Sequence, residues 1–324
     1  MAKTIGTHDG HFHCDEALAV FMLRQTALFR NASLIRSRDP KKLAECDVVV
    51  DVGGTYDPER HLYDHHQRGF FETFGQGYET KLSSAGLIYK HFGKEIIASS
   101  LKLEIDDANV ELLYKKMYTD FIEAIDGNDN GILQYPAEIE PKYKESTSLP
   151  ARVGSLNPWW NQTSTDSEVN KRFEKAVLLA GTELIDRIQF LGHAWIPARD
   201  LVVKAVENRF ELDQSGQVIK LEKACPWKEH LFNLEKELKI GTPILYVLYP
   251  DEKAVQWRIQ AVPIDPNSFQ NRKSLPESWR GYRDEELSER AGIKDCVFVH
   301  MSGFTGGNKT YDGVVEMAKK SLQN

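Results

Sequence analysis

Short apolar segments alternate with helical patterns in the first half of the chain, and this alternation constrains the fold more than any other feature. Patterns typical of buried strands occur at 3–8, 33–37, 47–54 and 61–66. Patterns typical of helices occur at 15–29, 39–46, 83–93 and 107–126. Strands that alternate with helices pair in parallel, because each crossover needs a connection of helix length. The sequence therefore predicts an α/β fold in which helices flank a mostly parallel sheet.

The pattern changes in the second half, which predicts further domains. Residues 130–165 are rich in Pro, Asn and Ser and predict a long irregular segment, the kind of loop that often carries function. Residues 166–212 predict a helical connector. Short β-like runs and a final helix follow at 216–222, 242–250, 254–263, 296–303 and 311–322. We therefore expect a first domain at 1–165 and a smaller α+β C-terminal domain at 213–324.

Charge, hydropathy and cysteine spacing exclude several classes of protein. The formal net charge is −7, so only a local basic patch or bound metal could attract a polyanion. No apolar run approaches the roughly 20 residues that span a membrane, and no targeting segment is visible. The four cysteines are far apart, which favours a reducing compartment. We expect an intracellular protein without a membrane anchor, although cytoplasm, nucleus and mitochondrion are not distinguished and the oligomeric state is open.

Histidine and aspartate gather where the predicted strands end. The first strand runs into HDGHFHCD, residues 8–15, and the third ends at Asp51. The fourth ends at His65 and His66, and the helix predicted at 107–126 ends at Asp126. In an open parallel sheet, sites form beyond the carboxyl ends of the strands. We therefore expect at least three imidazoles and three carboxylates in one crevice.

Such a crevice is suited to two divalent cations. Unpaired, three buried aspartates would repel one another and raise their pKa values. Two cations would remove that repulsion, and one carboxylate would bridge them at a separation of about 3.5–4 Å. Asp51 is the natural candidate for the bridge. Imidazole and carboxylate ligands without thiolate favour Mn²⁺, with Zn²⁺, Co²⁺ and Mg²⁺ as alternatives.

Four of these segments resemble the metal motifs of the DHH phosphoesterase superfamily. They read THDGHFHCDEALA, VVVDVGG, DHHQRGF and AIDGNDNG. Within the superfamily the chain is most similar to the Myg family, the melanocyte-proliferating-gene proteins, because the similarity extends to WRIQAVP, LPESWRGYRDEELSE and VFVHMSGFTGGNKT. The superfamily spaces its first motif H-x-x-x-D-x-D, whereas this chain reads H-x-x-x-x-H-x-D, as in the Myg branch. The resemblance implies a DHH-type fold and a metal-dependent 3′–5′ exonuclease acting on single-stranded RNA or short oligonucleotides.

The resemblance also implies which side chains bind the two metal ions. His8 and His13 would bind one ion. Asp15, His65 and Asp126 would bind the other, and Asp51 would bridge both. The implied ligands are His8, His13, Asp15, Asp51, His65 and Asp126.

Three further residues of the DHHQRGF motif take implied catalytic roles. His66 would face the phosphate as a hydrogen-bond donor or acid. Asp64 would orient a neighbouring imidazole from behind. Arg68 would pair with a non-bridging phosphate oxygen. A hydroxide activated by the two metals would attack phosphorus.

The segment GFTGGNKT, residues 303–310, has part of the pattern of a P-loop. Asn308 stands where the last glycine of that motif belongs, and too little chain follows for another strand, so we reject a P-loop. We predict instead a glycine-rich loop whose backbone N–H groups hold a substrate phosphate. The predicted substrate contacts of the C-terminal domain are His300, Gly306, Gly307, Asn308, Lys309 and Arg280.

Several aromatic and polar residues leave alternatives open. The basic and aromatic residues at 271–290 fit a path for single-stranded nucleic acid and a solvated face with a buried tryptophan equally well. We expect Trp159 and Trp160 to anchor their loop, in preference to the alternative that nucleic-acid bases stack on their rings. His11 favours an exposed loop imidazole, whereas His61 fits either a structural hydrogen bond or a supporting role at the metals.

The sequence thus favours a metal-dependent phosphodiesterase with a catalytic first domain and a C-terminal domain that contacts substrate. One alternative is a small-molecule phosphoesterase or pyrophosphatase that uses the same chemistry. The other is a non-catalytic binding protein that metals stabilise.

Overall fold

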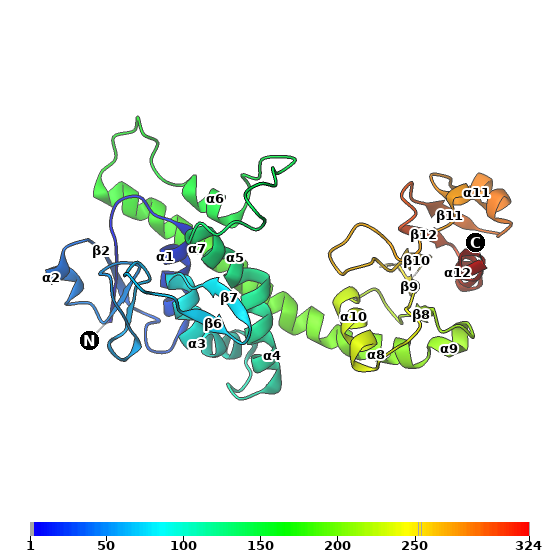
Figure 1. The fold of residues 1–324 in the computed structure, drawn as a ribbon, viewed down its shortest axis with the longest axis horizontal. Coiled ribbons are helices and arrows are strands. Elements are labelled where there is room, and N and C mark those ends of the chain that lie inside the picture. The colour runs from blue at the N-terminus through cyan, green and yellow to red at the C-terminus, as the bar shows by residue number, and fades with distance from the viewer. Residues whose placement is uncertain (1–2, 252, 254, 324) are drawn as a thin grey trace. The chain divides into compact units, whose positions relative to one another are not determined.

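The chain forms two compact units, Met1–Gly192 and His193–Asn324 (Figure 1). The computed structural model describes residues 3–251, 253 and 255–323. Predicted segments that include residues 1, 2, 252, 254 or 324 are compared over this described part only. The boundary between the units falls inside the segment 166–212 that was predicted to connect two domains.

A five-stranded sheet forms the centre of the first unit. Its order is β2 (Ser33–Arg36), β1 (Thr4–Thr7), β3 (Val48–Val50), β5 (Leu62–Tyr63) and β4 (Tyr56–Asp57). All neighbours are parallel except β4 and β5. The chain leaves β1 toward β2 and returns past it to β3, so β1 and β3 flank the point where the strand order reverses, which is where open α/β sheets bind ligands. The predicted α/β fold with a mostly parallel sheet is confirmed.

Three helices of the first unit pack on one another beside the sheet. They are α1 (Cys14–Gln25), α3 (Ser84–Leu101) and α7 (Asp166–Phe190), and the short α2 (Pro40–Leu43) follows β2. The helix α1 lies against both α3 and α7. Arg24 of α1 makes a two-pronged ion pair with Glu174 of α7. Gly181 lets α7 approach closely, because a Cβ there would lie 2.0 Å from the ring of Phe21.

The helix predicted at 107–126 is longer than expected and contains a defect. It consists of α4 (Ala108–Met117), a π-helical turn (Tyr118–Ile122) and α5 (Glu123–Asp129). Tyr118 is buried and stacks on Phe74 of the hairpin β6 (Thr73–Gly75) and β7 (Tyr78–Lys81) with a centroid distance of 3.9 Å. π-helical turns of this kind occur often at functional sites.

Residues 130–165 are mostly irregular, as predicted. Within this segment the structure adds one short helix, α6 (Leu149–Gly154). Short 3₁₀ turns lie at Pro58–Arg60 in the first unit and at Glu277–Trp279 in the second.

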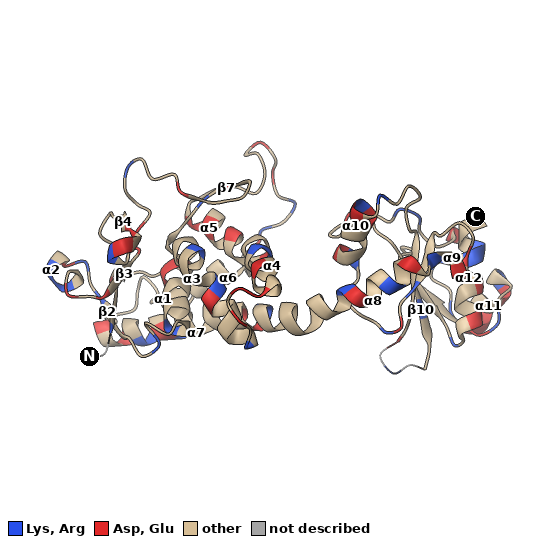
Figure 2. Ribbon diagram, turned by 90° about the horizontal axis from the view of Figure 1, so that it is seen from below, with Lys and Arg blue, Asp and Glu red and all other residues tan. Residues whose placement is uncertain are grey.

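The second unit is a sheet with helices on both faces (Figure 2). The strand order is β11 (Cys296–Val299), β12 (Thr305–Asn308), β10 (Trp257–Ala261), β9 (Tyr246–Pro250) and β8 (Val218–Lys220), antiparallel except for β8 and β9. The helices are α8 (Ile196–Glu207), α9 (Arg209–Leu212), α10 (Lys228–Glu237), α11 (Asp284–Ala291) and α12 (Tyr311–Gln323), and a π-helical turn at Leu191–Trp195 precedes α8.

Side chains of alternating direction give this sheet its two cores. Tyr246 and Leu248 pack with residues of α11 and α12, whereas Val247 packs with residues of α8 and α10. This alternation follows from the period of two along a strand. Among the described residues of the whole chain, no helix combines the length and apolar character that crossing a bilayer requires.

We expect Gly181→Ala to destabilise the first unit by about 1–3 kcal/mol, because the added methyl overpacks the contact between α1 and α7. Gly154→Ala is the matched control, since a Cβ at Gly154 meets no atom within 4 Å. Denaturant unfolding of both variants measures the difference. Equal stability of the two variants would contradict this close approach.

Candidate metal centre

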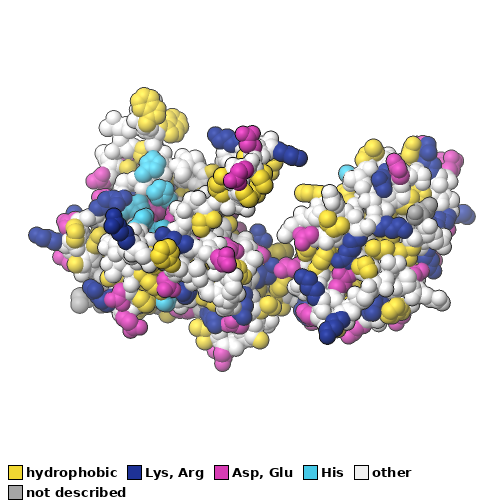
Figure 3. All heavy atoms as spheres, viewed as in Figure 1, with side chains coloured by type: hydrophobic (Ala, Val, Ile, Leu, Met, Phe, Trp, Pro, Cys, Tyr) yellow, Lys and Arg dark blue, Asp and Glu magenta, His cyan; other side chains and the backbone are white. Residues whose placement is uncertain are grey.

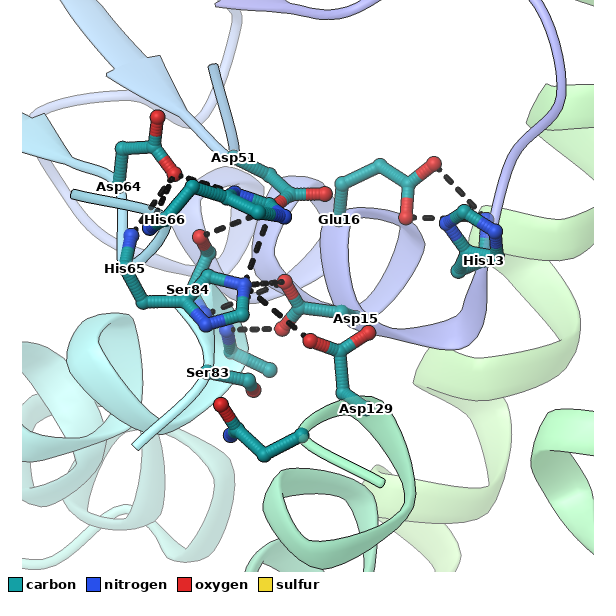
Figure 4. Close-up of polar contacts among 12 residues, drawn as sticks. His13, Asp15, Glu16, Asp51, Asp64, His65, His66, Ser83, Ser84 and Asp129 are labelled. Atoms are coloured by element: carbon teal, nitrogen blue, oxygen red, sulfur yellow. Dashed lines mark hydrogen bonds and ion pairs between the residues drawn. The ribbon is translucent and has the colours of Figure 1, made fainter. Parts of the chain in front are cut away.

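Asp51 lies at the centre of the site, directly after β3. Its backbone has a φ of 57°, a left-handed conformation that is uncommon for a residue other than glycine and is better tolerated by Asp and Asn. One carboxylate oxygen, Oδ2, lies 3.4 Å from Nε2 of His8. The other, Oδ1, lies 3.3 Å from Nε2 of His65. The two oxygens of a single carboxylate thus face two different imidazoles. Figure 4 shows Asp51 beside the ring of His65.

His8 follows β1 and belongs to a group with His13 and Glu16. The ligand atoms of these three residues all lie within 4.8 Å of one another. Nδ1 of His8 lies 2.9 Å from the Asp9 carbonyl oxygen, and Nε2 lies 3.0 Å from Glu16. A hydrogen bond from Nδ1 to a carbonyl leaves the lone pair on Nε2 free to bind a metal. The carboxylate of Glu16 also accepts the His13 backbone N–H.

Glu16 was not predicted as a site residue. It is fully buried in the first turn of α1, next to Asp15. Its sequence signal is its position three residues after the residue that caps the helix, where a carboxylate bonds back to the capping residue. That signal predicts a helix start and does not by itself indicate a metal ligand.

A second group joins Asp15, His65 and Asp129. Their ligand atoms also lie within 4.8 Å of one another. Nε2 of His65 is 3.1 Å from Asp129 and 3.9 Å from Asp15. Asp15 also accepts the N–H groups of Ser84 and Ala85 at the start of α3, whose positive end attracts a carboxylate. The segments at 8–15, 51 and 65–66 therefore converge as the sequence predicted.

Asp126 does not take the place that was expected for it. Its fully buried carboxylate accepts hydrogen bonds from the N–H and hydroxyl of Ser83 and from the hydroxyl of Tyr118. The helix α5 continues through Gly127 to Asp129, whereas the prediction ended the helix at Asp126. Because residues three apart lie about 300° around a helix, the later aspartate reaches the crevice at a different angle. We therefore replace Asp126 by Asp129 in the proposed ligand set.

Asp64 holds the neighbouring loops through hydrogen bonds to their backbone. It is almost fully buried, and its carboxylate accepts the backbone N–H groups of Gly54, His65 and His66. Its Oδ1 lies 2.7 Å from Nδ1 of His66. The side chain of His66 is 62% exposed, so its other ring nitrogen is accessible. Arg68 is also exposed, and no described residue forms an ion pair with its guanidinium.

Burial and opposite charge shift the pKa values of the cluster in opposing directions. Burial alone would lower the pKa of His8, but Asp51 and Glu16 raise it to about 10. Burial alone would likewise lower the pKa of His65, but Asp129 and Asp51 raise it to about 10. Burial would raise the pKa of Asp51, but His65 and His8 hold it below its usual range. Burial and the carboxylates of Asp51 and Asp129 raise the pKa of Asp15.

The residues fit a bound cation. Neither ring nitrogen of His65 makes a well-aligned hydrogen bond with a described residue, although Nε2 is buried among three carboxylates. A buried polar atom without a partner is rare in native proteins. A cation between this nitrogen and the carboxylates would give the nitrogen a partner and neutralise the carboxylates. The ligand atoms would be imidazole nitrogen and carboxylate oxygen, which bind Mn²⁺ and Zn²⁺.

The expected phosphate-binding loop in the second unit is wrong. Residues Thr305–Asn308 form β12, a strand that pairs on both sides. Gly306 and Gly307 are needed because a Cβ on either would lie about 3 Å from a neighbouring carbonyl oxygen. Asn308 is fully buried and bonds Lys294 and Thr310. Lys309 and His300 are exposed.

The segment 271–290 is mostly structural. Trp279 is buried in the core of the second unit, which favours the second of the two alternatives for this segment. Arg272 makes a two-pronged ion pair with Glu235, and Arg280 donates from Nε to the carbonyl of Leu275.

The histidines outside the cluster have simpler surroundings. His11 is exposed, as expected. His61 has a φ of 54° and its Nδ1 lies 3.3 Å from the hydroxyl of Tyr63, while its ring packs edge-on against Phe29. These contacts favour the structural alternative for His61.

The α/β sheet carries a histidine–aspartate cluster at its switch point, and this arrangement defines a candidate metal centre. Residues 4–322 match the family model MYG1_exonuc, which is described as "Uncharacterised protein family (UPF0160)". The chain belongs to this family, and the resemblance to the Myg proteins is confirmed.

Relatives of similar length cover nearly the whole chain. A human protein named MYG1 exonuclease is 52% identical over 98% of this chain and 85% of its own length. The MYG1 protein YER156C of Saccharomyces cerevisiae is 45% identical over 99% and 96%. A solved structure titled "pGpG-specific phosphodiesterase - PggH from Vibrio cholrae" aligns over 99% of this chain and 98% of its own at 13% identity and a TM-score of 0.31. The family names bear out the prediction of an enzyme of the exonuclease kind.

Removal of divalent metal should make the stability of the protein fall as pH rises from 7 to 9. His8 and His65 titrate near 10 when folded and near 6.5 when unfolded. The folded state therefore keeps protons that the unfolded chain has lost, and its extra stability, complete below 6.5, is lost as pH rises toward 10. We expect about 1.4 kcal/mol per pH unit for each histidine. Denaturant unfolding with chelator measures the slope, which His8→Gln should flatten; a stability that rises with pH contradicts it.

The replacement of Asp126 by Asp129 predicts different effects for two similar variants. Asp129→Asn should weaken metal binding at least about 100-fold, because it removes a ligand. Asp126→Asn should retain bound metal but lose about 1–2 kcal/mol of stability through its buried hydrogen bonds. Metal content after dialysis and chemical unfolding separate the two, and the reverse pattern would restore Asp126 as the ligand.

Proposed function

We propose that this protein is a metal-dependent 3′–5′ exonuclease that acts on single-stranded RNA or short oligonucleotides. The names of its relatives support the exonuclease activity. The metal dependence, the RNA substrate and the direction of digestion are our proposals. The metal dependence rests on the cluster at the carboxyl ends of β1, β3 and β5, whereas the RNA substrate and the direction of digestion rest on the resemblance to the Myg family.

The placement of Asp51 is the observation that carries the proposal. Its Oδ2 faces His8 and its Oδ1 faces His65, so one carboxylate is shared by two groups of potential ligands. A shared carboxylate is the typical bridge of two-metal phosphoesterases. We propose His8, His13 and Glu16 for one ion, and Asp15, His65 and Asp129 for the other.

The ligand set favours Mn²⁺, with Zn²⁺, Co²⁺ and Mg²⁺ as alternatives. When bound, such cations supply Lewis acidity toward water and toward the phosphoryl oxygens. The cations would also replace the protons that His8 and His65 hold in their absence, because metal ligands must be deprotonated.

His66 and Arg68 of the DHHQRGF motif would contact the substrate directly, and Asp64 would position His66. Asp64 holds the His66 ring by Nδ1, so Nε2 is free to donate a proton to the leaving oxygen. The hydrogen bond to Asp64 is the largest cause that raises the pKa of His66, and it stabilises the protonated imidazole. Arg68 would pair with a non-bridging phosphate oxygen.

Contacts from the second unit would add to substrate binding. Lys309 and His300 are the predicted contacts that are exposed, and Arg280 keeps its outer guanidinium nitrogens for a phosphate. We no longer include Gly306, Gly307 and Asn308, because they belong to the interior of a sheet.

Asp51→Asn should lower the rate of RNA hydrolysis at least about 1,000-fold in the presence of Mn²⁺. Asn tolerates the left-handed backbone of this position, so the fold should persist. His11→Gln is the control, because His11 is an exposed imidazole outside both groups. Hydrolysis of a labelled single-stranded RNA measures both variants. Full activity of Asp51→Asn would leave only a stabilising role for the metals.

The position of the label and the choice of substrate distinguish the alternatives. RNA labelled at its 5′ end should shorten one nucleotide at a time, whereas RNA labelled at its 3′ end should release labelled mononucleotide at once. A dinucleotide and pyrophosphate test for a small-molecule phosphoesterase. Cleavage of pyrophosphate alone would rule out the exonuclease.

A further inference from the structure

Two adjacent tryptophans lie exposed on the loop between α6 and α7. Trp159 is 66% exposed and Trp160 is 96% exposed, so the expectation that they anchor the loop is wrong. Two neighbouring indoles left in water form an apolar patch, and such patches mark binding sites. The site described above does not use them.

Hydrogen bonds fix the turn that carries the two rings. The Trp159 N–H donates to Oε1 of Gln162 at 3.1 Å, and the Gln162 N–H donates to the Trp159 carbonyl at 2.9 Å. From α7, Arg172 donates to the carbonyl of Leu156 and to Oε1 of Gln162. The rings therefore stand on an ordered turn, which lowers the entropic cost of binding.

The base of this loop is attached to the first metal motif. Asn157 is buried and bonds both backbone groups of Phe12, accepting from its N–H at 3.0 Å and donating to its carbonyl at 2.8 Å. Phe12 directly precedes His13 of the His8 group. Since Cα atoms are about 3.8 Å apart along the chain, Trp159 lies less than roughly 20 Å from His13. Hydrophobic side chains stand beyond a row of histidines on this face of the first unit (Figure 3).

Positive charge lies next to the same loop. A hollow of about 370 Å³ is lined by Gln162, Thr163 and Ser164 of the loop and by side chains of the first turns of α7. The charged side chains among these are Glu168, Lys171, Arg172 and Lys175. Three cations against one carboxylate contrast with the net charge of −7 of the whole chain.

We infer that Trp159 and Trp160 form a stacking platform for the bases of a single-stranded nucleic acid, with the phosphates beside the platform held by Lys171 and Lys175. The inference rests on the proposed function and extends it to the nucleotides beyond the cleaved one. Indole rings stack on any base, and flanking cations follow the backbone, which is how single strands are bound without sequence preference. A folded protein partner would require a larger apolar area than two rings present.

Binding of fluorescently labelled single-stranded RNA to the full chain, with chelator to prevent cleavage, tests this inference. Trp159→Ala/Trp160→Ala should weaken binding about tenfold or more, and Trp159→Phe/Trp160→Phe should restore most of the affinity. An abasic strand should bind the unaltered protein and the alanine variant equally. Phe190→Ala is the matched control, because Phe190 is an exposed aromatic at the far end of α7, and it should bind as the unaltered protein does.

The salt dependence of binding separates the rings from the lysines. Lys171→Ala/Lys175→Ala should reduce the slope of log affinity against log salt by about 1.4, since each phosphate contact on a single strand contributes about 0.7. The tryptophan variant should keep the full slope.

Three results would overturn the inference: equal RNA affinity with and without the rings, an equal loss for the abasic strand, or no RNA binding by the unaltered protein. Hydrolysis of bis(4-nitrophenyl) phosphate by the unaltered protein tests the proposed function separately, because this ester has no base to stack. A protein that hydrolyses the ester yet binds RNA independently of the rings keeps the proposed function and loses the platform.

Discussion

Repulsion among the carboxylates of buried Asp15 and Asp51 and of partly exposed Asp129 is the constraint on which the rest of the first unit depends. In surroundings of low dielectric, like charges this close would force the crevice open or take up protons. The fold supplies opposite charge from the amides that begin α3 and from the imidazoles of His8 and His65. The strand order brings these groups together, because β1 and β3 are neighbours and the chain leaves their carboxyl ends in opposite directions. Divalent cations would complete the balance.

A second set of contacts holds the loops that carry the ligands. Asp64 gathers three backbone amides around the histidine pair, and Arg36 donates to the carbonyl of Gly10 while its guanidinium lies over the ring of Phe173. Asn157 fixes Phe12 from the opposite side. Each of these residues acts on backbone and touches no proposed substrate atom. Such support is what keeps a site on loops as well defined as a site on regular elements.

The sequence could predict most of the first unit, because strand and helix patterns and the strand-end rule act locally. It also predicted that His8, Asp15, Asp51 and His65 gather in one crevice, since each lies near the end of a strand or the start of a helix; their role as metal ligands stays a prediction. It missed Glu16, whose spacing is that of an ordinary helix cap. It chose Asp126 over Asp129 because Gly127 predicts a turn directly after Asp126, whereas α5 continues through Gly127 to Asp129. The glycines of β12 resemble a loop in sequence, yet they reflect close strand packing that only the folded sheet reveals.

The π-helical turn at Tyr118–Ile122 has a consequence for the geometry of the cluster. Such a turn holds one surplus residue relative to an α-helix, and each residue rotates the chain by about 100°. That one residue therefore determines the direction in which every side chain after the turn points from the helix axis. Without it, Asp126 would face away from Ser83, and Asp129 would miss His65. The direction in which Asp129 points from this helix therefore depends on an irregularity in an earlier turn, where no proposed ligand lies.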